Sequence, residues 1–153
     1  MTKPKVLISD KMDPNAARIF EEHLGESDQA IDQLRKLLEE TPGDAEALAS
    51  LDRIFTGEGR HSDLIEVLDI RAGFAKSVQE RDELAFRAAR ITETELSDVE
   101  AAISRYQGIL ATTANHAGTH DALWAIAHGD DYRVPAIEAL EPRDKAADTV
   151  VIR

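Results

Sequence analysis

The chain has 153 residues, of which 42% are hydrophobic and 5% aromatic, and its 30 acidic and 18 basic side chains give a net charge of −12. The length suffices for one core, and a core poor in aromatic side chains favours helices packed through Leu, Ile and Ala over a β-sandwich. The acidic surface argues against nucleic acid and anionic membranes as partners, and the absence of cysteine excludes disulfides, thiolate metal sites and thiol nucleophiles.

Residues 3–22 are predicted to form a short strand followed by a helix. Val6-Leu7-Ile8 is a run of β-formers without helical spacing. This run is too short for a signal peptide or a membrane span, so we expect a cytoplasmic protein. Asp13-Pro14 is a helix-start pattern, because an N-cap carboxylate precedes a proline whose missing N–H costs nothing there. The helix is expected to run from Pro14 to about Leu24, with Gly25 as its stop.

Three more helices are predicted in the first half of the chain. Ser27 is expected to cap the first, which ends at Thr41-Pro42-Gly43. Asp44 is expected to cap the second, which stops at Gly57-Glu58-Gly59, and Ser62 to cap the third. The apolar side chains of each helix fall on one face: Ala30, Ile31, Leu34, Leu37 and Leu38; Leu48, Leu51 and Phe55; and Leu64, Ile65, Leu68 and Ala72.

The second half is predicted to contain four helices. The stretch 76–82 reads either as a loop or as the first turn of a helix that begins at about Arg81 and reaches Leu96. Ser97-Asp98-Val99-Glu100 has the capping-box pattern and starts a helix that reaches Leu110. After a loop at 114–118, a helix through 122–127 ends at Gly129. The last one, with Pro135 in its first turn, ends before Pro142. Thr149-Val150-Val151-Ile152 is strand-like.

One stretch of the chain occurs twice. Ala16 to Ile31 aligns with Ala88 to Ile103 after a shift of 72 positions, and eight of the sixteen residues are identical. A fixed-period echo is typical of repeat proteins, in which each unit buries its apolar face against its neighbours. We therefore expect two copies, at about 14–75 and 81–142.

The repeat resembles the tetratricopeptide family. Leu48-x-x-Leu51-x-x-x-Phe55 has the spacing of that family's first helix, while Ala30-x-x-x-Leu34 with Pro42, and Ala102-x-x-x-Tyr106, have the spacing of its second. Asp52, at a position that is small in the family, and Ala114, near the place of a closing proline, depart from the pattern. The resemblance implies an all-α, right-handed solenoid over residues 13–142, between a strand-like lead segment (1–12) and a tail (143–153). Its core is expected to contain Ala30, Leu34, Leu51, Phe55, Leu68, Ala102, Tyr106, Leu110 and Leu140.

A second resemblance covers residues 3–22, which are similar to the N-terminus of bacterial D-3-phosphoglycerate dehydrogenases. The dinucleotide-binding turn of that family, G-x-G-x-x-G between a strand and a helix, is absent from the sequence. The pair Gly57 and Gly59 has no strand before it. We therefore interpret the segment as an inert part of a fusion or fragment, whose helix serves as the first helix of a repeat hairpin.

No residue of the chain is predicted to be catalytic, to bind a cofactor or to ligate a metal. His116 and His120 have the i, i+4 spacing of a metal pair, but Gly118 lies between them and the glutamate of H-E-x-x-H is missing, so a polar helix start is favoured. Ser62 with its neighbours His61 and Asp63 cannot form a catalytic relay, because adjacent residues lack the geometry. Acidic pairs such as Glu39-Glu40 are interpreted as solvated helix surface.

The function implied by the repeat is that of a non-catalytic scaffold, which binds a peptide or helix of another protein in a concave groove. A basic peptide would be attracted by the net charge. Trp124 either anchors that peptide or packs against the final helix. The expected lining consists of Ala45, Leu48, Asp52, Arg87, Ala88, Ile91 and Trp124. Two alternatives stay open: an inactive fragment of, or fusion to, D-3-phosphoglycerate dehydrogenase, an enzyme of serine biosynthesis, and a module that self-associates through the edges Val6–Ile8 or Val150–Ile152.

Overall fold

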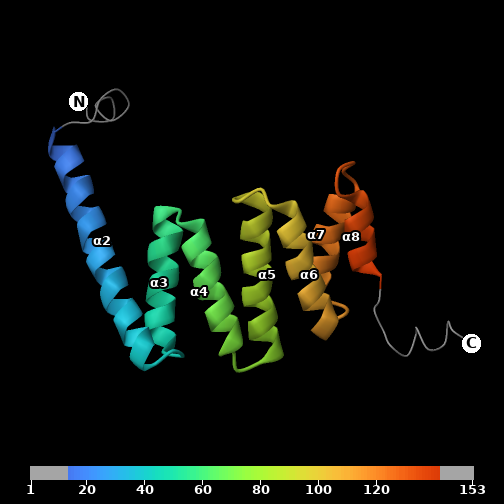
Figure 1. Ribbon diagram of the computed structural model, residues 1–153, viewed down its shortest axis with the longest axis horizontal. Coiled ribbons are helices and arrows are strands. Elements are labelled where there is room, and N and C mark those ends of the chain that lie inside the picture. Colours follow the sequence, from blue (N-terminus) through green and yellow to red (C-terminus); the bar gives the residue numbers. More distant parts are fainter. Residues whose placement is uncertain (1–13, 142–153) are drawn as a thin grey trace, which may run out of the picture. The chain divides into compact units, whose positions relative to one another are not determined.

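The computed structural model describes the backbone of residues 14–141 and the side chains of residues 25–141, and every regular element in this part is an α-helix (Figure 1). The expected all-α class is therefore confirmed for the described residues, whereas the predicted strands at 6–8 and 149–152 lie outside them. The helices are α2 (Pro14–Glu40), α3 (Ala45–Glu58), α4 (His61–Gly73), α5 (Val78–Thr94), α6 (Val99–Thr112), α7 (Ala117–Ala127) and α8 (Arg133–Leu140).

The first helix differs most from the prediction. α2 is continuous from Pro14 to Glu40, so Gly25 does not end a helix and Ser27 does not cap one. A glycine inside a helix costs only about 1 kcal/mol relative to alanine, which a long helix-forming sequence on both sides can offset. A side chain at Gly25 would meet nothing within 4 Å. The helix that we expected to form a hairpin with residues 27–40 is instead continuous with them.

The 72-residue echo in sequence is therefore not an echo in local structure. Residues 16–31 lie within one helix, whereas residues 88–103 leave α5, turn, and enter α6. The turn depends on Asp98, whose Oδ1 accepts a hydrogen bond from the backbone N–H of Ala101 at 3.0 Å. The aligned residue of the first copy is Glu26, and glutamate is not among the side chains that cap helices well. The first copy thus lacks the residue that caps the start of α6 in the second, and the two copies differ in local structure.

The chain divides into two compact units, residues 1–54 and 55–153, with α3 crossing the boundary. In the first unit, the loop 41–44 connects α2 to α3, as predicted from Thr41-Pro42-Gly43. Asp44 caps α3 as expected, since its Oδ1 accepts a hydrogen bond from the Ala47 N–H at 2.8 Å. The buried apolar side chains of this unit are Ile31, Ala47, Leu48 and Leu51.

Most helix contacts in the second unit join neighbours in sequence. α4 packs against α5, α5 against α6, α6 against both α7 and α8, and α7 against α8. Small side chains at Ala89 and Ala102 let the helix axes approach closely, and the fully buried Tyr106 fills the space beside them. The core shared by α5 to α8 consists of Ala89, Ala102, Ile103, Tyr106, Ile109, Ala122, Leu123, Ala127, Ala136 and Ala139.

In this unit, three helix starts differ by a few residues from the predicted ones. Arg60, and not Ser62, precedes the first residue of α4, and no side chain caps that helix. Ser77 caps α5 by accepting from the Glu80 N–H, so the stretch 76–82 holds the first turn of a helix and is not a loop. Asp98 caps α6 in place of Ser97, which adopts φ 54°. The stop at Gly59 is confirmed by its φ of +67°, which glycine adopts without strain. Pro135 lies in the first turn of α8, as predicted.

Candidate interaction groove

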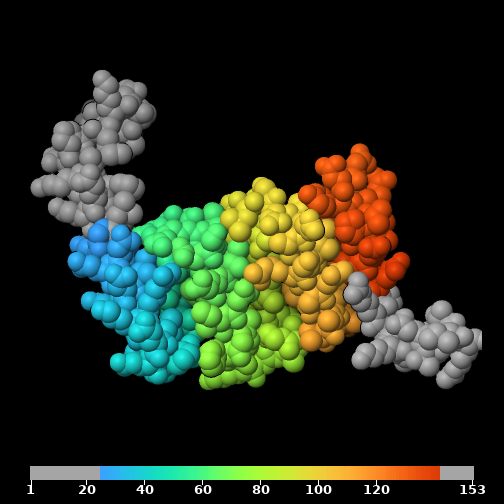
Figure 2. Space-filling model, in the orientation of Figure 1, coloured from blue at the N-terminus to red at the C-terminus, as the bar shows by residue number. Residues whose placement is uncertain are grey.

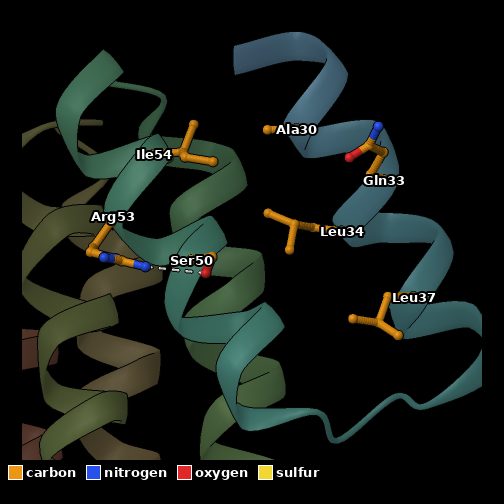
Figure 3. Close-up of a pocket in the computed structure, with 7 residues that line it drawn as sticks. All are labelled: Ala30, Gln33, Leu34, Leu37, Ser50, Arg53 and Ile54. Carbon is orange, nitrogen blue, oxygen red and sulfur yellow. Dashed lines mark hydrogen bonds between the residues drawn. The ribbon is translucent and has the colours of Figure 1, made fainter. Parts of the chain in front are cut away.

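An open groove runs between the two helices of the first unit. It has a volume of about 670 Å³ and is lined by Ala30, Gln33, Leu34 and Leu37 from α2 and by Ser50, Arg53 and Ile54 from α3. Figure 3 shows Leu34 and Leu37 extending from α2 toward α3 across this groove. Arg53 donates a hydrogen bond from Nη2 to Ser50 Oγ at 3.2 Å. The lining is thus mainly apolar, with one cation among its polar groups.

The helical period explains why these side chains remain accessible. Ile31 on α2 and Leu48 and Leu51 on α3 are buried and form the core of the unit. Leu37 lies on the neighbouring strip of α2, and 41% of its surface is exposed. Ala30 and Leu34 are half-buried there. These two residues were expected in the core, and they line the groove instead.

The groove residues predicted from sequence do not form one accessible lining. Leu48, Asp52 and Ala88 are buried, so their side chains are not available to a peptide, and their assignment to a groove was wrong. Leu48 shares the core face of α3 with Leu51, and Ala88 is one of the small residues at which helices approach closely. Ala45 and Trp124 are exposed, and Arg87 and Ile91 are half-buried.

The predicted groove residues also lie in different units. Ala45, Leu48 and Asp52 belong to the first unit, and Arg87, Ala88, Ile91 and Trp124 to the second. Arg87 donates a hydrogen bond from Nη2 to Thr56 Oγ1 at 3.1 Å. The residues that do line the α2–α3 groove, above all Gln33, Ser50 and Arg53, were missed, because their polar side chains give no apolar signal. Ala30, Leu34 and Leu37 could have been found, from their place in the apolar stripe.

Most of the residues predicted for the core are buried or partly buried. Leu51, Phe55, Leu68, Ala102 and Tyr106 are buried, as expected. Leu110 and Leu140 are partly buried and pack against the core of the second unit.

Trp124 is not covered by the final helix, because 53% of its surface is exposed and its ring lies beside His128, with 6.3 Å between the ring centroids. Tyr132, Val134 and Ile137 are also exposed, so α7 and α8 present apolar side chains to solvent as well as to the core. These two helices are the orange to red part of the surface in Figure 2.

A second, smaller hollow of about 360 Å³ lies among α4, α5 and α6, and each of its charged residues has an ion-pair partner. Asp82 is buried and accepts hydrogen bonds from Thr113 Oγ1 and from Arg81 Nη2, the latter at 2.9 Å. Burial alone would raise the pKa of Asp82, but the hydrogen bonds from Thr113 and Arg81 and the positive charge of Arg81 outweigh it and lower that pKa. These contacts join the N-terminal part of α5 to the residue that follows α6.

The remaining polar contacts of this hollow and its surroundings also join helices. Arg105 donates two hydrogen bonds to the carboxylate of Asp69, at 2.8 and 2.9 Å, and links α6 to α4. Tyr106 donates from its hydroxyl to Glu93 Oε1 at 2.6 Å. Burial, together with this bond to a carboxylate, raises the pKa of Tyr106. Side chains that hold one another in this way serve the packing of the helices.

The residues weighed for chemistry have structural contacts. His116 caps α7 by accepting at Nδ1 from the Thr119 N–H at 3.2 Å, and His120 Nε2 lies 2.7 Å from the Ala114 carbonyl oxygen, as expected of a polar helix start. His61 Nε2 lies 3.5 Å from Glu95 Oε2, while Asp63 accepts from Arg60 Nε at 2.9 Å. Among the described residues, no group of three or more His, Cys, Asp or Glu side chains is placed to hold a metal ion.

Within residues 14–141, no helix combines the length and the apolar character that a membrane crossing requires. Comparisons of the chain with protein-family models, with curated proteins and with solved structures gave no match. Because these comparisons gave no match, we infer a function from the geometry of the α2–α3 groove.

Proposed function

We propose that this chain is a non-catalytic interaction module that holds a helix of another protein in the α2–α3 groove. The observation that carries the proposal is the groove itself, a trough of about 670 Å³ floored by leucine and isoleucine side chains. A helix that docks in a groove inserts apolar side chains spaced three and four residues apart. Ala30, Leu34 and Leu37 follow that spacing, so they can interdigitate with such a partner.

The family part of the proposal is restricted to the second unit. The adjacent, packed helices α5 and α6, with Ala102 and Tyr106 both fully buried between their neighbours, support a tetratricopeptide-like hairpin there. A right-handed solenoid of such hairpins is the extended form of this proposal. The continuous α2 argues that the first unit departs from that plan and offers a different surface for binding.

The test uses a neutral synthetic probe. A capped, fluorescein-labelled peptide of about 16 residues carries leucines on one helical face and glutamine, alanine and serine elsewhere. Titrating it with the full chain is expected to give saturable fluorescence anisotropy with a Kd of about 10–100 μM. Leu37→Asp should weaken binding at least about tenfold, because burying a carboxylate against apolar groups is costly.

A matched variant controls for general effects of charge and of lost apolar surface. Val134→Asp removes a side chain that is 64% exposed in the other unit, and it should bind the probe like the natural chain. Circular dichroism checks that both variants remain helical. The proposal is overturned if the natural chain shows no saturable binding, or if Leu37→Asp and Val134→Asp bind equally well.

Each of the two alternatives inferred from the sequence is tested by a separate measurement on the same protein. Saturable quenching of tryptophan fluorescence by a nicotinamide dinucleotide would favour a dehydrogenase fragment. A molar mass that rises with concentration in light scattering would favour self-association. We expect neither result.

A further inference from the structure

The α2 side of the groove carries a charge pattern as well as an apolar one. Glu26, Ala30, Gln33, Leu37 and Glu40 follow one another at spacings of four, three, four and three residues, so they lie along one stripe of the helix. The two glutamates are exposed and stand at the ends of the stripe, with the groove-lining residues between them. At 1.5 Å per residue, they are about 21 Å apart along the helix axis.

The end of the groove beside the connecting loop is the more acidic one. Glu40 is the last residue of α2, and Glu46 lies in the first turn of α3, one turn before the lining residue Ser50. Glu46 is well placed for the α3 dipole, but Glu40 is not, because the C-terminal end of a helix favours cations and the last turn of α2 has no basic residue. A cation from a partner would offset the unfavourable interaction between the Glu40 carboxylate and the C-terminal end of α2.

The charged residue of the groove lining itself has the opposite sign. Arg53 lines it and is held toward Ser50 by a hydrogen bond of 3.2 Å. A partner with positive charges in its centre would be repelled there, whereas one with positive charges at its two ends would meet Glu26 at one end and Glu40 with Glu46 at the other.

We propose that the partner of the α2–α3 groove is an amphipathic helix with lysine or arginine in its first and last turns and an uncharged apolar centre. This inference rests on the proposed function, since it concerns the same groove and adds the charge pattern of its occupant. The basic ends provide selectivity and faster association, and the apolar centre provides the contact.

The experiment compares three forms of the labelled probe with the full chain. All have the same leucine face, and their end turns carry lysine, serine or glutamate. At low salt, the lysine form is expected to bind at least about fivefold tighter than the serine form, and the glutamate form more weakly than both. At about 1 M salt, where the screening length is about 3 Å, the three should converge.

Charge reversal identifies the residues responsible. The double variant Glu26→Lys with Glu40→Lys should abolish the preference for the lysine probe. The matched control, Asp32→Lys with Glu39→Lys, makes the same change in net charge at exposed positions on another side of α2 and should leave most of the preference intact.

The outcomes separate the two proposals. Equal binding of all three probes overturns the charge inference and leaves the groove function standing. An equal loss of preference in both double variants also overturns the inference, because it would show attraction to net charge alone. If no probe binds, or if the lysine probe binds Leu37→Asp as well as it binds the natural chain, both proposals fail.

Discussion

Asp82 offers the sharpest test of how the second unit is held together. The predicted change is Asp82→Ala, which removes the acceptor for Arg81 and for the Thr113 hydroxyl. Hydrogen bonds to a charged group contribute about 1.5–3 kcal/mol, and here they should exceed a surface ion pair, because Asp82 is only 4% exposed. We expect Asp82→Ala to lower the free energy of unfolding by about that amount at pH 7, measured by urea denaturation followed by circular dichroism.

The pH dependence of this loss follows from the lowered pKa of Asp82. A carboxyl group whose pKa is lower in the folded than in the unfolded chain binds fewer protons when folded, so it stabilises the fold above its unfolded pKa, near 3.8. That contribution disappears as the pH falls from there through the lowered folded value. The difference between the natural chain and Asp82→Ala should therefore be constant from pH 7 to about pH 5 and shrink below pH 4.

A double-mutant cycle with Thr113→Val tests whether the loss comes from the contact itself. Val is close in shape to Thr and lacks the hydroxyl, so the two changes together should cost less than their sum, by at least about 0.5 kcal/mol. A cost below about 0.5 kcal/mol for Asp82→Ala, or strictly additive effects in the cycle, would refute the assignment of this carboxylate to the link between α5 and α6.

Three further predictions concern single side chains. Leu51→Ala should lower the free energy of unfolding by about 2–5 kcal/mol, because the side chain is 2% exposed, and a loss below half a kcal/mol in urea denaturation would show that it is not in the core. At Ser97, where φ is 54°, Ser97→Gly should change the thermal midpoint little or raise it. Ser97→Val should lower stability by about 1–2 kcal/mol, and equal midpoints would contradict a left-handed residue. Arg105→Met should cost no more than about 1 kcal/mol, because its partner Asp69 is half exposed. A salt titration of the unfolding midpoint checks this, and a salt-independent loss above 2 kcal/mol would contradict it.

The sequence predicts helices well where a break and a cap coincide. Pro42 and Gly43 precede Asp44, and the loop and the cap appear where expected. The period of the apolar residues likewise identifies Leu51 and Leu68 as core, because they lie on the one apolar face of their helix, and that face packs against other helices.

The groove could not be predicted in the same way. Whether Leu37 is covered depends on how much of α2 the shorter α3 can shield, and no local pattern encodes that area. Leu48 and Ala88 were assigned to a groove by analogy with a repeat, yet both lie on the faces that pack against neighbouring helices. Sequence spacing says which residues share a face, and only packing decides whether that face is a core or a surface.

The echo between Ala16–Ile31 and Ala88–Ile103 shows how little sequence separates a continuous helix from a hairpin. Glycine in the first copy aligns with Ser97, so the first copy could adopt the left-handed turn more easily than the second does. One difference lies at the next position, where Asp98 accepts the N–H of Ala101 and caps α6, whereas the aligned residue of the first copy is the longer Glu26. Since α2 stays continuous, Glu26 and Glu40 fall on one stripe with the groove between them. Glu26, which aligns with the helix cap Asp98 of the second copy, is thus one of the residues to which we assign the selection of the partner.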